Sequence, residues 1–138
     1  MILLDTNVLI SGFDPHSPYY NWASVIIRKA LLDSGAAANP VILSELMVGD
    51  AKPATVVSRL ETLGIELLDL PAGTAFRCAK AYDSYLQRRR MHQGTPPPKC
   101  PLPDFFIGAH ASILGLALAT ADTGRYQTYF PEVELLTP

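Results

Sequence analysis

Four acidic side chains stand where a catalytic or metal-binding carboxylate would be expected. Asp5 follows the apolar run 2–4, and Asp122 follows the apolar run 116–121. Asp104 opens an apolar helical segment, and Glu45 lies among apolar residues in another. Clustered carboxylates repel one another unless a cation neutralises them, and all-oxygen ligand sets favour hard ions such as Mg²⁺ or Mn²⁺. If the fold brings these acids together, they form a site for a divalent metal ion.

Each of these acids also has a purely structural interpretation. Asp5 and Asp122 could cap the helices that follow them. Asp104 could be a first-turn acid that the helix dipole favours, and Glu45 could point into solvent. What favours a shared site is position, because three of the four acids map to the same edge of the sheet if its strands are parallel. That edge, beyond the carboxyl ends of parallel strands, is where ligands bind in open α/β sheets.

The elements that would position the acids follow from hydrophobic runs and the residues that interrupt them. We expect strands at 2–4, 36–38, 65–68, 116–120 and 133–136. We expect helices at 19–34, 41–48, 53–63, 71–90 and 104–114, and a proline-rich loop at 94–103. Strands that alternate with helices predict an α/β fold with a parallel sheet covered on both faces. The expected architecture is a three-layer α/β/α sandwich around a central, mainly parallel sheet of four to five strands.

Length and composition limit the class of protein. A chain of 138 residues predicts a single domain, residues 1–138, with 49% hydrophobic and 17% charged residues. The net charge of −2 argues against a basic nucleic-acid footprint over the whole surface, but it leaves room for a local basic groove. Cys78 and Cys100 lack metal-ligand spacing and read as reduced thiols.

From the sequence we expect neither a signal peptide nor a membrane span. Its first apolar stretch is broken at Asp5, and its most hydrophobic segment, 105–121, is too short and too interrupted to cross a bilayer. Phosphate-binding, dinucleotide-binding, serine-hydrolase and zinc-protease motifs are also missing. His16, His92 and His110 have no partner spacing. We therefore expect a cytoplasmic protein with no membrane partner.

Four segments occur in an order and at separations that are typical of one family. They are MILLDTNVLI at the N-terminus, SEL at 44–46, LPDFFIGAHA at 102–111 and ATADTGRYQTYFP at 119–131. Together they resemble the PIN domain, in particular the VapC-like toxins of type II toxin–antitoxin systems. The resemblance spans essentially the whole chain. It implies a metal-dependent ribonuclease with an α/β/α sandwich, a homodimer and a cognate antitoxin protein as partner.

The resemblance also assigns roles to the acids. The acidic residues of the family carry over to Asp5, Glu45, Asp104 and Asp122. Asp5 and Asp104 would be the main ligands of Mg²⁺ or Mn²⁺. Asp122 would bind the ion directly or through water, and Glu45 would be a ligand or a water-orienting base.

Other residues would support these acids or the RNA. The small polar residue of the family falls on Asn7 and its hydroxyl on Thr120, and both would hold the carboxylates by hydrogen bonds. Basic residues would have to help RNA approach an acidic pocket. The candidates are Arg88, Arg89, Arg90, Lys99 and Arg125. The arginine run could instead be a solvated helix end, and Arg125 could simply pair with a carboxylate.

Two other functions stay open at this point. One is an aspartate-based phosphatase with Asp5 as nucleophile, although position 7 is Asn where a second Asp would be expected. The other is a non-catalytic binding module whose carboxylates are inert. In the toxin interpretation, apolar helices around 22–27 and 41–48 would form a groove for an amphipathic segment of the antitoxin.

Overall fold

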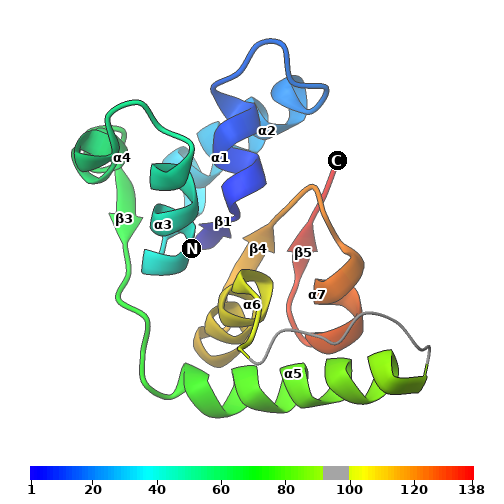
Figure 1. The fold of residues 1–138 in the computed structure, drawn as a ribbon. Coiled ribbons are helices and arrows are strands. Elements are labelled where there is room, and N and C mark those ends of the chain that lie inside the picture. Colours follow the sequence, from blue (N-terminus) through cyan, green and yellow to red (C-terminus); the bar gives the residue numbers. More distant parts are fainter. Residues whose placement is uncertain (92–99) are drawn as a thin grey trace.

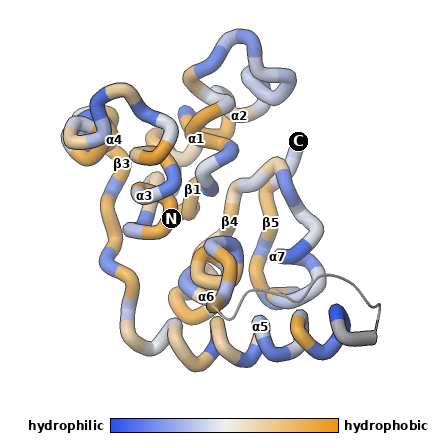
Figure 2. The backbone as a smooth tube through the Cα atoms, in the orientation of Figure 1, coloured by the Kyte–Doolittle hydropathy of each residue, from blue (hydrophilic) through white to orange (hydrophobic). Residues whose placement is uncertain are grey.

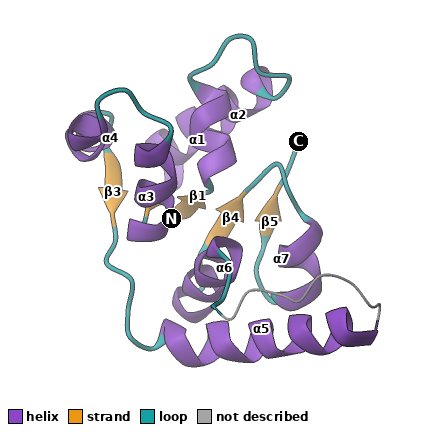
Figure 3. Cartoon of the chain, in the orientation of Figure 1, coloured by secondary structure: helices purple, strands orange, loops and turns teal. Residues whose placement is uncertain are grey.

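A five-stranded parallel sheet forms the centre of the molecule (Figures 1 and 3). The computed structural model describes residues 1–91 and 100–138, with the backbone alone for 90 and 91. Its strands are β1 (Ile2–Leu4), β2 (Ala36–Ala38), β3 (Ile65–Leu67), β4 (Ala117–Ala119) and β5 (Leu135–Leu136). They lie in the order β3-β2-β1-β4-β5, and every neighbouring pair is parallel. The expected parallel sheet is confirmed, with β1 as its central strand.

Helices flank this sheet and complete the expected three-layer sandwich. They are α1 (Thr6–Gly12), α2 (Tyr20–Lys29), α3 (Pro40–Val48), α4 (Val56–Thr62), α5 (Thr74–Met91), α6 (Pro103–Leu114) and α7 (Gly124–Tyr129). Helix α1 packs on α2, and α5 packs on α6 and α7. Figure 1 shows α5 running along one side of the molecule, beneath α6 and α7. In the part of the chain that the structure describes, no helix has the length and hydrophobicity of a membrane span.

Some helices differ from the sequence-based expectation. The helix expected at 19–34 is α2 followed by a π-helical turn, η1 (Ala30–Ser34), which Gly35 closes with a φ of 87°. The helix expected at 53–63 starts as a 3₁₀ turn, η2 (Pro53–Thr55), and the one expected from residue 71 begins at Thr74. Helices α1 and α7 lie outside the expected ranges. With seven and six residues they are too short to show a helical period.

Burial explains why the short strands form. Leu3, Leu4 and Leu118 are completely buried, and β2 is three buried alanines. Figure 2 shows hydrophobic residues along β4 and β5. Strands buried on both faces appear in a sequence as continuous apolar runs, which is why three residues are enough to mark β1 and β2.

The sheet register places the first acid beside the end of β4. Leu4 pairs with Ala119, and the backbone amide of Asp5 donates to the carbonyl of Ala119 at 3.0 Å. The chain therefore leaves β1 and β4 side by side, at the carboxyl edge of the sheet. Helix α6 ends as expected at Gly115, whose left-handed φ of 62° favours glycine. Of the proline-rich loop expected at 94–103, the part up to 99 lies outside the described residues, as do His92 and Lys99.

Candidate active site

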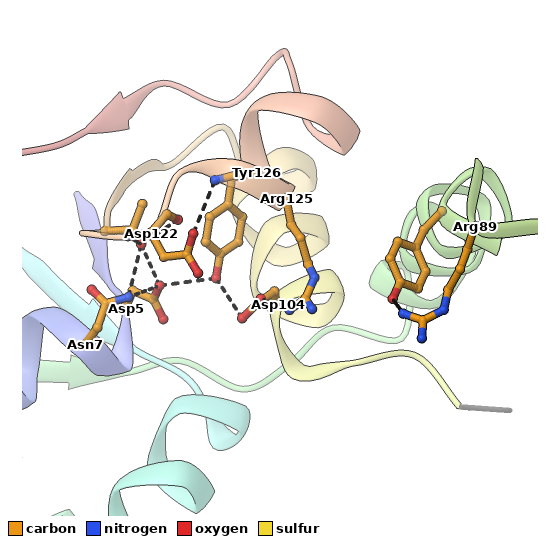
Figure 4. Close-up of polar contacts among 10 residues, drawn as sticks. Asp5, Asn7, Arg89, Asp104, Asp122, Arg125 and Tyr126 are labelled. Carbon is orange, nitrogen blue, oxygen red and sulfur yellow. Dashed lines mark hydrogen bonds and ion pairs between the residues drawn. The ribbon is translucent and has the colours of Figure 1, made fainter. Parts of the chain in front are cut away.

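Asp5 is the most buried acid of the predicted set, with 4% of its surface exposed. Its Oδ1 accepts from the backbone amide of Thr6 at 2.7 Å, so Asp5 does cap α1. Its Oδ2 faces the other way and accepts from Thr120 Oγ1 at 2.7 Å and from Asn7 Nδ2 at 2.9 Å (Figure 4). Asp5 can therefore cap α1 through Oδ1 while Oδ2 belongs to the candidate site.

Burial raises the pKa of Asp5 above its ordinary value of 3.8. The hydrogen bonds from Thr120 and Thr6 act in the opposite direction, and the charges of Asp104 and Glu45 add to the rise. The cause lies in the position of the carboxylate, because a charged group is less stable where water is excluded and where like charges are near. A cation placed among these acids would relieve both costs.

Asn7 and Thr120 join the segments that follow β1 and β4. Asn7 Oδ1 accepts from the backbone amide of Ala121 at 2.9 Å, and Asn7 Nδ2 also reaches Thr120 Oγ1 at 3.2 Å. The amide of Asp122 donates to Thr120 Oγ1 at 3.1 Å. The structure thus brings both expected supporting residues into contact with Asp5, and it locks the two strand ends together.

Asp104 enters the site from the first turn of α6. Its Oδ2 accepts from Arg125 Nη1 at 2.7 Å, and its Oδ1 lies 3.5 Å from the hydroxyl of Tyr126. That hydroxyl also lies 3.3 Å from Asp5 Oδ2, so Tyr126 stands between the two acids in Figure 4. Arg125 takes the role left open for it, as the partner of a site carboxylate. Arg125 and Tyr126 are consecutive residues of α7 that contact different oxygens of one carboxylate.

Tyr126 is the site residue that sequence reasoning missed. It is 1% exposed, and burial together with the charges of Asp5 and Asp104 raises its pKa far above the usual value. Its hydroxyl therefore keeps its proton. The sequence gives no clear signal for Tyr126, because α7 has only six residues and shows no helical period.

Glu45 and Asp122 occupy the margins of the site. Glu45 Oε2 accepts from Thr6 Oγ1 at 2.6 Å, which turns the half-buried side chain toward α1 and away from solvent. Asp122 is exposed, and its Oδ1 accepts from the backbone amide of Gly124 at the start of α7. Asp122 therefore supports the beginning of α7.

The donor set fits a hard divalent cation held by two protein carboxylates. Asp5 and Asp104 offer oxygen ligands only, and one hydroxyl contacts both of them. Mg²⁺ is commonly bound through one or two carboxylates and keeps several waters. Within residues 1–91 and 100–138, no three His, Cys, Asp or Glu side chains gather closely enough to hold one ion. A contact of Asp122 with the ion, directly or through water, remains a prediction.

Of the predicted basic residues, Arg125 on α7 contacts Asp104, whereas Arg88 and Arg89 lie on α5 near aromatic rings. Arg89 Nη1 donates to the hydroxyl of Tyr85 at 2.8 Å, and the guanidinium of Arg125 lies 6.0 Å from the ring of Tyr85. Arg88 lies 6.0 Å from the ring of Tyr129. Figure 4 shows Arg89 on the far side of Arg125 from Asp5. Going outward from Asp104, the order of contacts is therefore Arg125, Tyr85 and Arg89. Lys99 and the side chain of Arg90 lie outside the described residues.

Fold and site together define an α/β/α protein with a carboxylate pair at the carboxyl edge of a parallel sheet. Comparison with known families agrees: residues 2–131 match the PIN domain, and the chain belongs to the PIN domain family. None of the curated proteins compared with the chain matches it.

Several solved structures share the fold. DNA-bound VapBC from Salmonella typhimurium is 20% identical, with a TM-score of 0.68 over 99% of this chain and 96% of the other. FitAcB from Neisseria gonorrhoeae is 24% identical, with a TM-score of 0.67 over 99% and 96%. The Mycobacterium tuberculosis toxin VapC20, which cleaves the sarcin–ricin loop, is 12% identical, with a TM-score of 0.63 over 97% and 99%. At these identities the likeness concerns the fold.

Proposed function

We propose that this protein is a Mg²⁺- or Mn²⁺-dependent endoribonuclease that hydrolyses RNA phosphodiester bonds. The observation that carries the proposal is the meeting of Asp5 and Asp104 on one tyrosine hydroxyl, at the carboxyl edge of a PIN-domain sheet. A divalent ion bound there would offset charge on the phosphate and lower the pKa of a water nucleophile. Asp5 and Asp104 are the proposed main ligands, and Asp122 is proposed to bind the ion directly or through water.

The chain's own residues prepare this site before substrate arrives. Thr120 and Asn7 hold the Asp5 carboxylate by two hydrogen bonds, so Asp5 loses little freedom when it takes up a ligand. Glu45 is proposed to orient the attacking water, since Thr6 holds its carboxylate next to the start of α1. A carboxylate can accept the proton of that water within hydrogen-bond distance.

The RNA strand is proposed to lie along α5 and α7. Arg88 and Arg89 provide charges that the phosphate backbone can pair with, and Tyr85 and Tyr129 provide rings beside them. Alternating arginine and aromatic side chains suit single-stranded RNA, because bases stack on rings while phosphates bind guanidinium groups. This arrangement gives a local basic path on a chain whose net charge is −2.

We also propose that the protein is the toxin of a toxin–antitoxin pair, acting as a homodimer in the cytoplasm. Similar structures include VapBC and FitAcB, named above, and a toxin–antitoxin complex from Klebsiella pneumoniae. A hollow of about 480 Å³ between α1, α3 and α4 provides a seat for the partner. It is lined by Ile10, Phe13, Leu46 and Leu63, with Glu45 and an Asp50–Arg59 ion pair among its polar residues.

This hollow refines the expected partner groove. Residues of the helix expected at 41–48 line this hollow, whereas the segment 22–27 does not. Ile27 instead lines a separate hollow together with Gly12 and Phe13. Glu45 belongs both to the hollow and to the margin of the acidic site. An apolar helix seated in the hollow would therefore extend toward Asp5, where a basic side chain could block the site.

The decisive experiment is RNA cleavage by the purified protein with Mg²⁺ or Mn²⁺, compared with excess EDTA. Asp5→Asn keeps the shape and the capping oxygen but removes the ligand charge, so it should abolish cleavage and leave the fold intact. Cleavage that survives chelation, or an active Asp5→Asn protein, would contradict the proposal. A phosphorylated Asp5 would favour a phosphatase, and an inert protein that still binds RNA would favour a binding module.

The toxin assignment has its own test. Expression of the wild-type chain should arrest growth, expression of Asp5→Asn should not, and co-expression with the product of the adjacent gene should restore growth. A harmless wild-type chain without a bound neighbour would remove the toxin assignment, while the nuclease assignment could stand on the cleavage assay.

A further inference from the structure

Tyr126 has a hydroxyl that the proposed reaction does not use, yet it lies inside the site. It is 1% exposed, and its oxygen is 3.3 Å from Asp5 Oδ2 and 3.5 Å from Asp104 Oδ1. The two acids come from different elements, the end of β1 and the first turn of α6. A third element, α7, therefore links them through one oxygen atom.

In the contacts among Tyr126, Asp5 and Asp104, the tyrosine hydroxyl must be the hydrogen-bond donor. A carboxylate oxygen can only accept, whereas a phenol hydroxyl has one proton to donate. The hydroxyl of Tyr126 can therefore donate to either acid in turn, and its oxygen lies within 3.5 Å of both carboxylates. Arg125 contacts the other oxygen of Asp104, so two consecutive residues of α7 contact both oxygens of that carboxylate.

The position of Tyr126 is itself well determined. The backbone amide of Phe130 donates to the Tyr126 carbonyl at 2.9 Å, and Thr123 stands at the start of α7. Helix α7 packs on α5 and α6. Phe130, at the end of α7, lies against Gly108, where a Cβ would collide with the phenyl ring. The tyrosine ring is thus anchored by packing, and the hydroxyl at its tip meets the acids from a rigid base.

We propose that Tyr126 is a positioning residue that sets the separation and orientation of Asp5 and Asp104 for a divalent cation. The inference rests on the metal site of the proposed function. Without the hydroxyl, the one proton that can be donated to either carboxylate is lost, and binding an ion must then restrict more of their motion. Loss of a hydrogen-bond partner of a metal ligand typically weakens metal affinity roughly 10- to 100-fold.

The test is to titrate the metal-free protein with Mn²⁺ and to measure binding by isothermal titration calorimetry. Tyr126→Phe keeps the buried ring and removes one oxygen atom. Its dissociation constant for Mn²⁺ should rise roughly 10- to 100-fold, while the melting temperature of the metal-free protein stays close to that of the parent. The matched control is Tyr82→Phe on α5, whose buried ring packs on Tyr85 and Phe105. It should bind Mn²⁺ like the parent protein.

A second variant distinguishes positioning from general loosening of the fold. In an Asp104→Asn background, Tyr126→Phe should weaken Mn²⁺ binding by a much smaller factor, because one of the two acids that it positions is gone. Equal or tighter Mn²⁺ binding by Tyr126→Phe overturns the inference while the proposed metal site stands. A parent protein that does not bind Mn²⁺ overturns both.

Discussion

Arg125 donates to Asp104 Oδ2 at 2.7 Å, so a cation from α7 is paired with the acid that opens α6. The Arg125 side chain is 43% exposed and that of Asp104 26%. Ion pairs at such exposure contribute about 0–1 kcal/mol to stability. A divalent ion that binds Asp104 would have to displace Arg125 from it. Because this ion pair contributes so little free energy, its loss should cost the metal little affinity.

Divalent metal should therefore stabilise the folded protein against heat. At a concentration one hundred times its dissociation constant, a ligand that binds only the folded state adds about 2.7 kcal/mol. Differential scanning calorimetry of stripped protein, with and without Mg²⁺ or Mn²⁺, measures the gain. Asp104→Asn should lose most of it. Equal melting temperatures with and without metal in the parent protein would argue against the site.

The arginines of α5 should control RNA affinity and its dependence on salt. Replacing Arg88 and Arg89 together with Gln should weaken binding of a single-stranded RNA. Each lost phosphate contact should lower the slope of log affinity against log salt by about 0.7. The matched control is Arg28→Gln with Lys29→Gln, an equal charge change on the exposed face of α2. If both double variants bind like the parent, the arginines of α5 are a solvated helix end.

His110 should make stability depend on pH. Asn39 Nδ2 contacts His110 Nδ1 at 3.0 Å, and Asn39 Oδ1 accepts from the amide of Ile42, which turns the amide nitrogen toward the ring. Within the described residues, His110 Nε2 is buried without a hydrogen-bond partner. Burial lowers the pKa of His110 below 6.5. The folded state therefore binds this proton less tightly than the unfolded chain.

The sign follows from that difference. Above pH 6.5, the ordinary pKa of histidine, neutral His110 makes its full contribution to the free energy of unfolding. This contribution is lost as the pH falls from 6.5 through the lower pKa of the folded state. The slope is at most about 1.4 kcal/mol per pH unit. Urea denaturation across this range measures it. His110→Gln keeps an acceptor for Asn39 and should flatten the slope, whereas His16→Gln, at an exposed position, should leave the His110 slope in place.

Gly108 should be intolerant of a side chain. A Cβ at this position would overlap the ring of Phe130, so Gly108→Ala should lower the free energy of unfolding by about 1–3 kcal/mol. Gly49→Ala is the control, because no atom lies within 4 Å of the Cβ that it would add. Chemical denaturation measures both. Combining Gly108→Ala with Phe130→Leu should recover part of the loss, and no recovery would contradict the overlap as its cause.

The sequence alone determined the framework and most of the acidic site. The apolar runs at 2–4 and 36–38 became β1 and β2, and Gly115 ended α6, because strand burial and helix termination depend on neighbouring residues. The position of Asp5 at a strand end followed for the same reason. Parallel strands then placed Thr120 beside Asp5, since neighbouring strand ends share one edge of the sheet.

Tertiary structure alone decided how the acids are arranged. Whether Asp104 would meet solvent, a metal or Arg125 depended on the packing of α7 against α6, two helices joined through β4. The insertion of Tyr126 between Asp5 and Asp104 links residues that are 121 and 22 positions apart. A six-residue helix shows no period that predicts which side it buries. Side-chain packing between distant segments, and not local pattern, therefore set the geometry of the site.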